Sequence, residues 1–158
     1  MSDGPNPRLE PAMRAPWQVR LGKLLARMLG WQIRGTLPPQ FWKTTLVVWA
    51  PQPWQMRLLA WTLPVRTNRV LRAPQASMHH TIVDGFHHGR ATMVSTKATT
   101  EDLESIVNEA RSAKSRITLC AFEHGRKFVH VHAPFRTSPF PDRDVHYMMR
   151  YFKYFKQP

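Results

Sequence analysis

The sequence is poor in cysteine and in long apolar segments. A single cysteine, Cys120, excludes a disulfide within the chain of 158 residues and fits a reducing compartment. No segment reaches the roughly 18 apolar residues that a membrane-spanning helix needs. The first 16 residues hold four prolines and no apolar core, unlike a secretory signal. We therefore expect a cytoplasmic protein without a transmembrane helix.

Acidic residues are also scarce, and the resulting charge is uneven. The net charge is +13, from 23 Lys or Arg against ten Asp or Glu. Residues 1–72 carry eleven basic and two acidic residues, a net of +9, whereas residues 73–158 carry twelve and eight, a net of +4. Such a field concentrates anions near the surface. The candidate partners are nucleic acid, an anionic membrane and phosphate-bearing small molecules.

Several motifs that would assign a function directly are absent from the sequence. There is no Walker loop, no G-x-G-x-x-G and no G-x-S-x-G motif. No helix-turn-helix pattern, zinc-finger spacing or aromatic RNP-like strand is present either. Nucleic-acid binding is thus supported by charge and aromatic content alone.

The hydrophobic pattern predicts an α/β fold. Residues 1–15 read as a disordered basic arm, and residues 16–158 as one α/β domain with a small mixed sheet flanked by helices. Helical spacing predicts helices over 17–29, 54–63, 101–113 and 142–155. Apolar runs predict strands over 44–50, 91–96, 116–122 and 127–132, the last two as a hairpin around residues 123–126. Residues 73–89 give no clear pattern.

One stretch of the chain resembles a known family. The run from Leu29 to Gly35 (LGWQIRG), then Pro38 and an apolar strand ending in Ala50-Pro51, resembles the opening of the lysophospholipid (glycerolphosphate) acyltransferases. The late strands, Pro134-Phe135 and a closing helix opened by Asp142 and Asp144 are similar in style to the end of the short bacterial members. The resemblance implies an acyltransferase-like α/β fold.

The resemblance also implies that catalysis has been lost. The family needs a histidine as general base and an aspartate that orients it. In this sequence Gln52 and Arg57 occupy those positions, and neither side chain can do that chemistry at neutral pH. The family's Glu-Gly-Thr-Arg-like phosphate motif has no counterpart. The resemblance therefore implies a degenerate, catalytically inactive member.

Basic and aromatic residues in the first half of the chain are candidates for lipid binding. Arginine and lysine side chains bind phosphate through charge-assisted hydrogen bonds, and the candidates are Arg20, Lys23, Arg27, Arg57 and Arg66. Tryptophan beside basic residues is typical of a membrane interface, and the candidates are Trp17, Trp42 and Trp54. We expect Trp49 and Trp61 to lie in the core instead.

Histidines form a second chemical cluster. His80, Asp84, His87 and His88 would share one face of a helix and could bind zinc. Gly85 and the apolar pair Ile82–Val83 argue against a continuous helix there. A polar surface loop is the competing interpretation. His130 and His132 alternate with valines, and we expect them on a solvated strand face. Apart from a possible zinc ion, no cofactor is expected.

Three functional hypotheses follow. The first is an inactive acyltransferase-like protein that binds anionic phospholipid or lysophospholipid at a membrane surface. The second is a basic module that binds RNA or another nucleic acid. The third is a metal-binding protein that uses the cluster between His79 and His88.

Overall fold

The computed structural model describes residues 13–35, 44–50, 52–67, 71–72, 78–123 and 127–156. A central sheet has the strand order β1-β6-β5-β2-β4-β3. The strands are β1 (Gln32–Arg34), β2 (Thr44–Trp49), β3 (Leu71–Arg72), β4 (Thr92–Ser95), β5 (Arg116–Glu123) and β6 (Phe128–Phe135). The helices are α1 (Pro16–Met28), α2 (Pro53–Thr62), α3 (Met78–His87), α4 (Thr100–Ser112) and α5 (Pro141–Lys156). The predicted α/β class with a mixed sheet is confirmed.

The sheet is parallel at its centre and antiparallel at the hairpin. Strand β2 pairs in parallel with both β4 and β5, and β5 pairs antiparallel with β6 as the hairpin pattern predicts. Strand β1 then pairs in parallel with β6. The apolar run of β2 is almost wholly buried, because a central parallel strand is covered on both faces.

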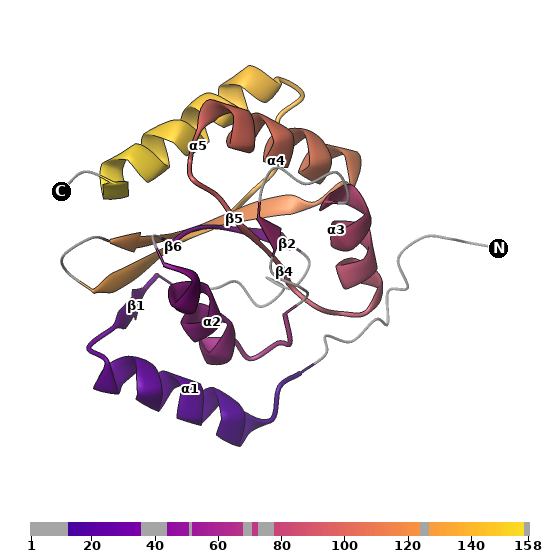
Figure 1. Cartoon of the computed structure of the whole chain (residues 1–158). Helices are drawn as coiled ribbons and strands as arrows, with labels where there is room; N and C mark the ends of the chain where they lie inside the picture. The colour runs from indigo at the N-terminus through magenta and orange to yellow at the C-terminus, as the bar shows by residue number, and fades with distance from the viewer. Residues whose placement is uncertain are drawn as a thin grey trace.

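Successive strand residues pack into two different cores. Leu46 and Val48 of β2 join the core under α1 and α2, whereas Val47 joins the core under α3, α4 and α5. This division follows from the alternation of side chains along a strand. Figure 1 shows the resulting layers, with α4 and α5 on one side of the sheet and α1 and α2 on the other.

Local sequence signals account for several element ends. The hydroxyl of Thr99 accepts a hydrogen bond from the Asp102 backbone N–H at the start of α4, as expected for an N-cap. Helix α1 has Pro16 in its first turn and ends before Gly30, whose φ is +84°. The predicted helix boundaries of α1 and α4 are therefore confirmed within two residues.

The sequence interpretation is wrong at two elements. Helix α3 runs continuously through Gly85, although that glycine argued against it. A glycine costs about 1 kcal/mol in a helix interior and does not by itself break the helix, and Ile82 anchors α3 in the core. Strand β1 is not predicted by the sequence pattern.

The N-terminal arm expected over residues 1–15 is only partly described. Residues 1–12 lie outside the described residues. At the end of the arm, the Arg14 backbone N–H donates to the Pro64 carbonyl.

Candidate functional site

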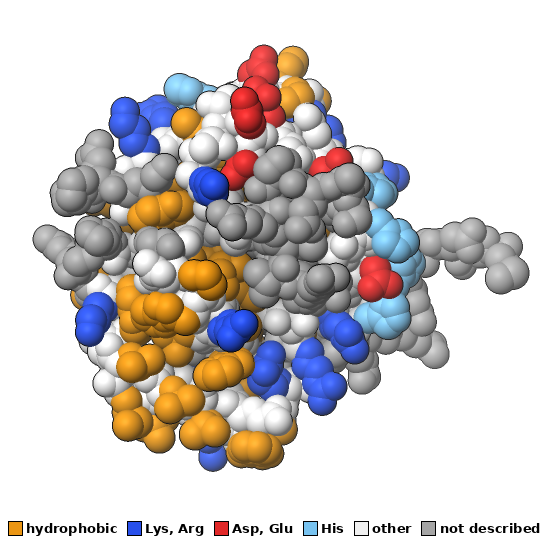
Figure 2. Space-filling view, in the orientation of Figure 1, with side chains coloured by type: hydrophobic (Ala, Val, Ile, Leu, Met, Phe, Trp, Pro, Cys, Tyr) orange, Lys and Arg blue, Asp and Glu red, His pale blue; other side chains and the backbone are white. Residues whose placement is uncertain are grey.

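Helix α1 presents its large apolar side chains to solvent. Trp17, Leu21, Leu24 and Met28 recur at helical spacing and are between 48% and 74% exposed. The opposite face of the helix, which carries Gly22 and Ala26, is buried instead. Figure 2 shows apolar side chains gathered over the region of α1, with Lys and Arg side chains beside them. We call the four exposed residues the apolar stripe.

Small residues explain this inverted arrangement. A Cβ placed on Gly22 would lie 2.3 Å from the carbonyl oxygen of Trp61 in α2. The backbones of α1 and α2 therefore approach so closely that only a glycine fits between them. Because the contact face holds glycine and alanine, the bulky side chains of the helix remain outside.

A basic flank runs along one side of the apolar stripe. Arg20, Lys23 and Arg27 follow one another at spacings of three and four residues, so they share one side of α1. All three are exposed, and the described residues contain no ion pair that involves any of them. Their positive charges are thus available to an external anion.

A pocket of about 740 Å³ lies between α1 and the sheet. Elements from both halves of the chain form its walls, including α1, β1, α2, β2, β5 and β6. The lining residues are Lys23, Ala26, Arg27, Gly30, Trp31, Gln32, Ile33, Gly35, Leu46, Leu59, Thr62, Leu63, Pro64, Cys120 and Val131.

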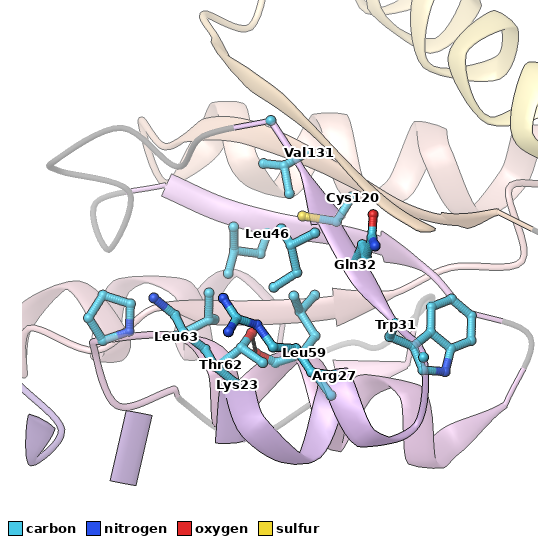
Figure 3. A pocket seen from close by; sticks show the side chains of 15 residues that line it. Lys23, Arg27, Trp31, Gln32, Leu46, Leu59, Thr62, Leu63, Cys120 and Val131 are labelled. Atoms are coloured by element: carbon cyan, nitrogen blue, oxygen red, sulfur yellow. Dashed lines mark hydrogen bonds between the residues drawn. The ribbon is translucent and has the colours of Figure 1, made fainter. Parts of the chain in front are cut away.

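The interior of the pocket is apolar and its edge is cationic. Leu46, Leu59 and Leu63 are each at most 3% exposed and line the buried part. Lys23 and Arg27 are exposed and come from α1. Figure 3 shows these two side chains extending from the helix toward the pocket, with Leu46, Cys120 and Val131 of the sheet beyond them. None of the described lining residues is acidic.

The polar groups of the wall are not poised for catalysis. Burial raises the pKa of the Cys120 thiol from 9.0 to about 12, so this thiol is protonated at neutral pH. The hydroxyl of Thr62 donates to the Leu59 carbonyl at 2.7 Å. Among the lining residues that the structure describes, there is neither a histidine nor a carboxylate that could act as a general base.

The positions that the family resemblance assigns to catalysis lie elsewhere. Gln52 and Arg57 are exposed and do not line the pocket. The Gln52 backbone N–H donates to the Gln55 side-chain oxygen at 2.9 Å, which caps the start of α2. Gln52 therefore has a structural role at the helix start.

The other predicted lipid contacts are only partly brought together. Lys23 and Arg27 meet at the pocket, whereas Arg20, Arg57 and Arg66 are exposed outside it. Trp54 is 46% exposed and lies edge-on to Trp31, with ring centroids 6.1 Å apart. Trp42 lies outside the described residues.

The expectation that Trp49 and Trp61 are core residues is correct only in part. Trp49 is half-buried and packs against the core under α4 and α5. Trp61 is 49% exposed, because the close approach of α1 covers its backbone and Cβ rather than its ring.

The histidine cluster on α3 is exposed. The Asp84 carboxylate lies 3.4 Å from Nδ1 of His88, and both side chains are more than half exposed. Among the described residues, no group of three or more His, Cys, Asp or Glu side chains is arranged to hold a metal ion. His80 and His87 are exposed on the same helix.

The histidines of β6 are packed, which contradicts the expected solvated face. The ring of His130 stacks on Phe155 of α5 at 4.3 Å, and its Nε2 lies 2.7 Å from the Glu123 carboxylate. Nε2 of His132 lies 2.5 Å from the Tyr147 hydroxyl. Helix α5 covers this side of the strand, and the alternation within β6 gave no sign of that cover.

No protein-family model matches this chain, and no curated protein or solved structure is detectably similar to it. Within the part of the chain that the structure describes, none of the helices combines the length and the apolar character needed to cross a bilayer. Apart from Lys23 and Arg27, the residues of the pocket wall are the ones that sequence reasoning missed. Their one sequence signal is the pair Gly22 and Ala26, small residues one turn apart on the face of α1 that opposes the apolar stripe.

Proposed function

We propose that this protein binds anionic phospholipid or lysophospholipid at a membrane surface, as an acyltransferase-like protein without acyl-transfer activity. The observation that carries the proposal is the apolar stripe of α1 beside its basic flank. A helix with one apolar side and Lys or Arg along its border is the type that lies in a membrane interface.

The energetics favour an anionic surface. Each basic residue near such a surface contributes about 1 kcal/mol of attraction. Arg20, Lys23 and Arg27 lie on one side of α1 with no acidic partner among the described residues. Insertion of the apolar stripe would remove side chains such as Trp17 and Met28 from water, which adds a hydrophobic contribution.

The absence of turnover is proposed from the resemblance and from the chemistry of the residues present. Gln52 and Arg57 stand where the acyltransferases have histidine and aspartate. An amide is not a general base at neutral pH, and a guanidinium does not orient an imidazole as a carboxylate does. Lipid would thus be bound and not acylated.

Co-sedimentation with vesicles tests this proposal. The full-length protein should bind phosphatidylserine-containing vesicles in preference to pure phosphatidylcholine vesicles, and salt should weaken the binding by screening. Replacement of Trp17 or of Leu21 by serine should each weaken vesicle binding about fivefold. Full burial of such a side chain contributes about 2 kcal/mol, and each substitution should remove roughly half of that energy. Arg20→Gln should also cost about fivefold.

Control variants come from α5, on the opposite side of the sheet. Tyr154→Ser removes a residue that is 75% exposed, and Lys153→Gln removes an exposed charge. Neither should change vesicle binding. If RNA competes the protein off the vesicles, the nucleic-acid alternative replaces the membrane proposal. If the α5 variants weaken vesicle binding as much as the α1 variants do, α1 is not the docking element. Acyl transfer from acyl-CoA to lysophosphatidic acid would refute the proposed inactivity.

A further inference from the structure

We infer that the pocket between α1 and the sheet binds the acyl chain of a single-chain anionic lipid, with Lys23 and Arg27 on its head group. This inference rests on the proposed function and goes further, because it assigns a ligand class to a cavity rather than a membrane to a surface. The lipid would be held as one molecule, separately from the contact of the apolar stripe with the bilayer.

The composition of the pocket matches one amphiphilic molecule. Its volume of about 740 Å³ lies within the range of about 300–1,000 Å³ that small-molecule sites occupy. The buried part is formed by Leu46, Leu59 and Leu63. A polar ligand would find few donors there, since the Thr62 O–H already donates to the Leu59 carbonyl. An alkyl chain needs none.

The two cations are placed to share one anionic group. Lys23 and Arg27 are separated by one helical turn, so their side chains lie next to each other on the same side of α1. Both line the pocket, and neither has an acidic partner among the described residues. A phosphate or carboxylate at the mouth would accept charge-assisted hydrogen bonds from both. Arg20, on the same helix, is outside the lining.

The test uses soluble n-alkyl phosphates at concentrations where they are monomeric. Affinity is measured by isothermal titration calorimetry. The total tryptophan fluorescence is a second readout, because Trp31 is one of the six tryptophans and lines the pocket. Each added methylene should tighten binding about fourfold, from octyl to dodecyl phosphate, until the chain fills the pocket. Dodecanoate should also bind, whereas dodecyl maltoside, which has no charge, should bind at least tenfold more weakly. A phosphatidic acid with two short chains should not bind more tightly than the single-chain ligand of equal chain length.

Variants separate the pocket from the membrane surface. Lys23→Gln and Arg27→Gln should each weaken dodecyl phosphate binding about tenfold, whereas Arg20→Gln should leave it unchanged. Val131→Phe places a phenyl ring where the smaller valine side chain lines the pocket, and it should abolish the dependence of affinity on chain length. A thermal melt of each variant without ligand shows whether it is folded.

A measurement on the unaltered chain gives independent support. Cys120 lines the pocket and is the chain's single cysteine, so its side-chain carbon, labelled with carbon-13, gives one NMR signal, and dodecyl phosphate should shift that signal. Vesicle binding with no dependence of alkyl phosphate affinity on chain length and no shift of the Cys120 signal would overturn the pocket assignment and leave the proposed function standing. Alkyl phosphate binding without vesicle binding would overturn the membrane proposal and leave the pocket as a site for soluble lipid. Loss of both would overturn both.

Discussion

Replacement of Gly22 by alanine should destabilise the protein, although this substitution usually stabilises a helix. In an exposed helix interior, alanine in place of glycine gains about 1 kcal/mol of stability. In α1, however, the new Cβ would lie 2.3 Å from the Trp61 carbonyl oxygen and 2.7 Å from its carbonyl carbon. These are backbone atoms of another helix, so no side-chain rotation relieves the contact.

The expected magnitude follows from two opposing contributions. Overpacking of a tight contact typically costs 1–3 kcal/mol, and at a Cβ–oxygen separation this short we expect the cost at the upper end, about 3 kcal/mol. The gain in helix propensity offsets about 1 kcal/mol. The net result is a decrease of about 2 kcal/mol in the free energy of unfolding, and α1 should separate from α2 before the rest of the fold opens. Amide hydrogen exchange of residues 16–28 should report it directly.

Gln18→Ala is a suitable control, because Gln18 is exposed on the same helix and the propensities of the two residues are similar. It should change stability by no more than a few tenths of a kcal/mol. If Gly22→Ala instead stabilises the protein by about 1 kcal/mol and leaves α1 protected, the close packing of α1 on α2 is wrong. The pocket would then lack its outer wall as we describe it.

Two further predictions concern ionisation and a helix contact. Burial raises the pKa of Cys120 to about 12 and raises that of Tyr151 above its usual value, so both groups stay protonated in the fold under conditions where the unfolded chain ionises. The free energy of unfolding should therefore fall as the pH rises above 9.0, by up to about 1.4 kcal/mol per pH unit and group. Urea unfolding across this range measures the slope, and Cys120→Ala should reduce it. Asp144→Ala removes a buried carboxylate that lies 3.3 Å from Arg111 of α4, and it should cost about 2 kcal/mol in urea unfolding. Asp142→Ala, at an exposed position in the same helical turn, should cost about 0.5 kcal/mol, and equal losses would contradict this role for Asp144.

The sequence predicted elements that depend on local patterns. The apolar run of β2 and the capping threonine of α4 are signals within a few residues, and both are confirmed. Strand β1 has only three residues and forms by pairing with β6, far along the chain. Such a short segment has no periodicity of its own, so its state is decided by the partner.

The candidate site was predictable in its charges but not in its shape. Lys23 and Arg27 could be chosen as anion ligands because of their residue types and spacing. The pocket could not, because its walls come from six elements that meet only in the folded chain. The hydrophobic pattern also does not predict which face of α1 is buried. Helical spacing identifies the apolar stripe, but the close contact at Gly22 decides that the stripe faces solvent.

The pairing of β1 with β6 also sets an order of events during synthesis. Gln32 pairs with Phe128, so at about 5–20 residues per second the ribosome must work for roughly 5–20 seconds between these two residues. Throughout that interval β1 has no partner strand, and the pocket lacks the walls that β5 and β6 supply. The nascent α1 therefore leaves the ribosome with its apolar stripe before the cavity behind it exists.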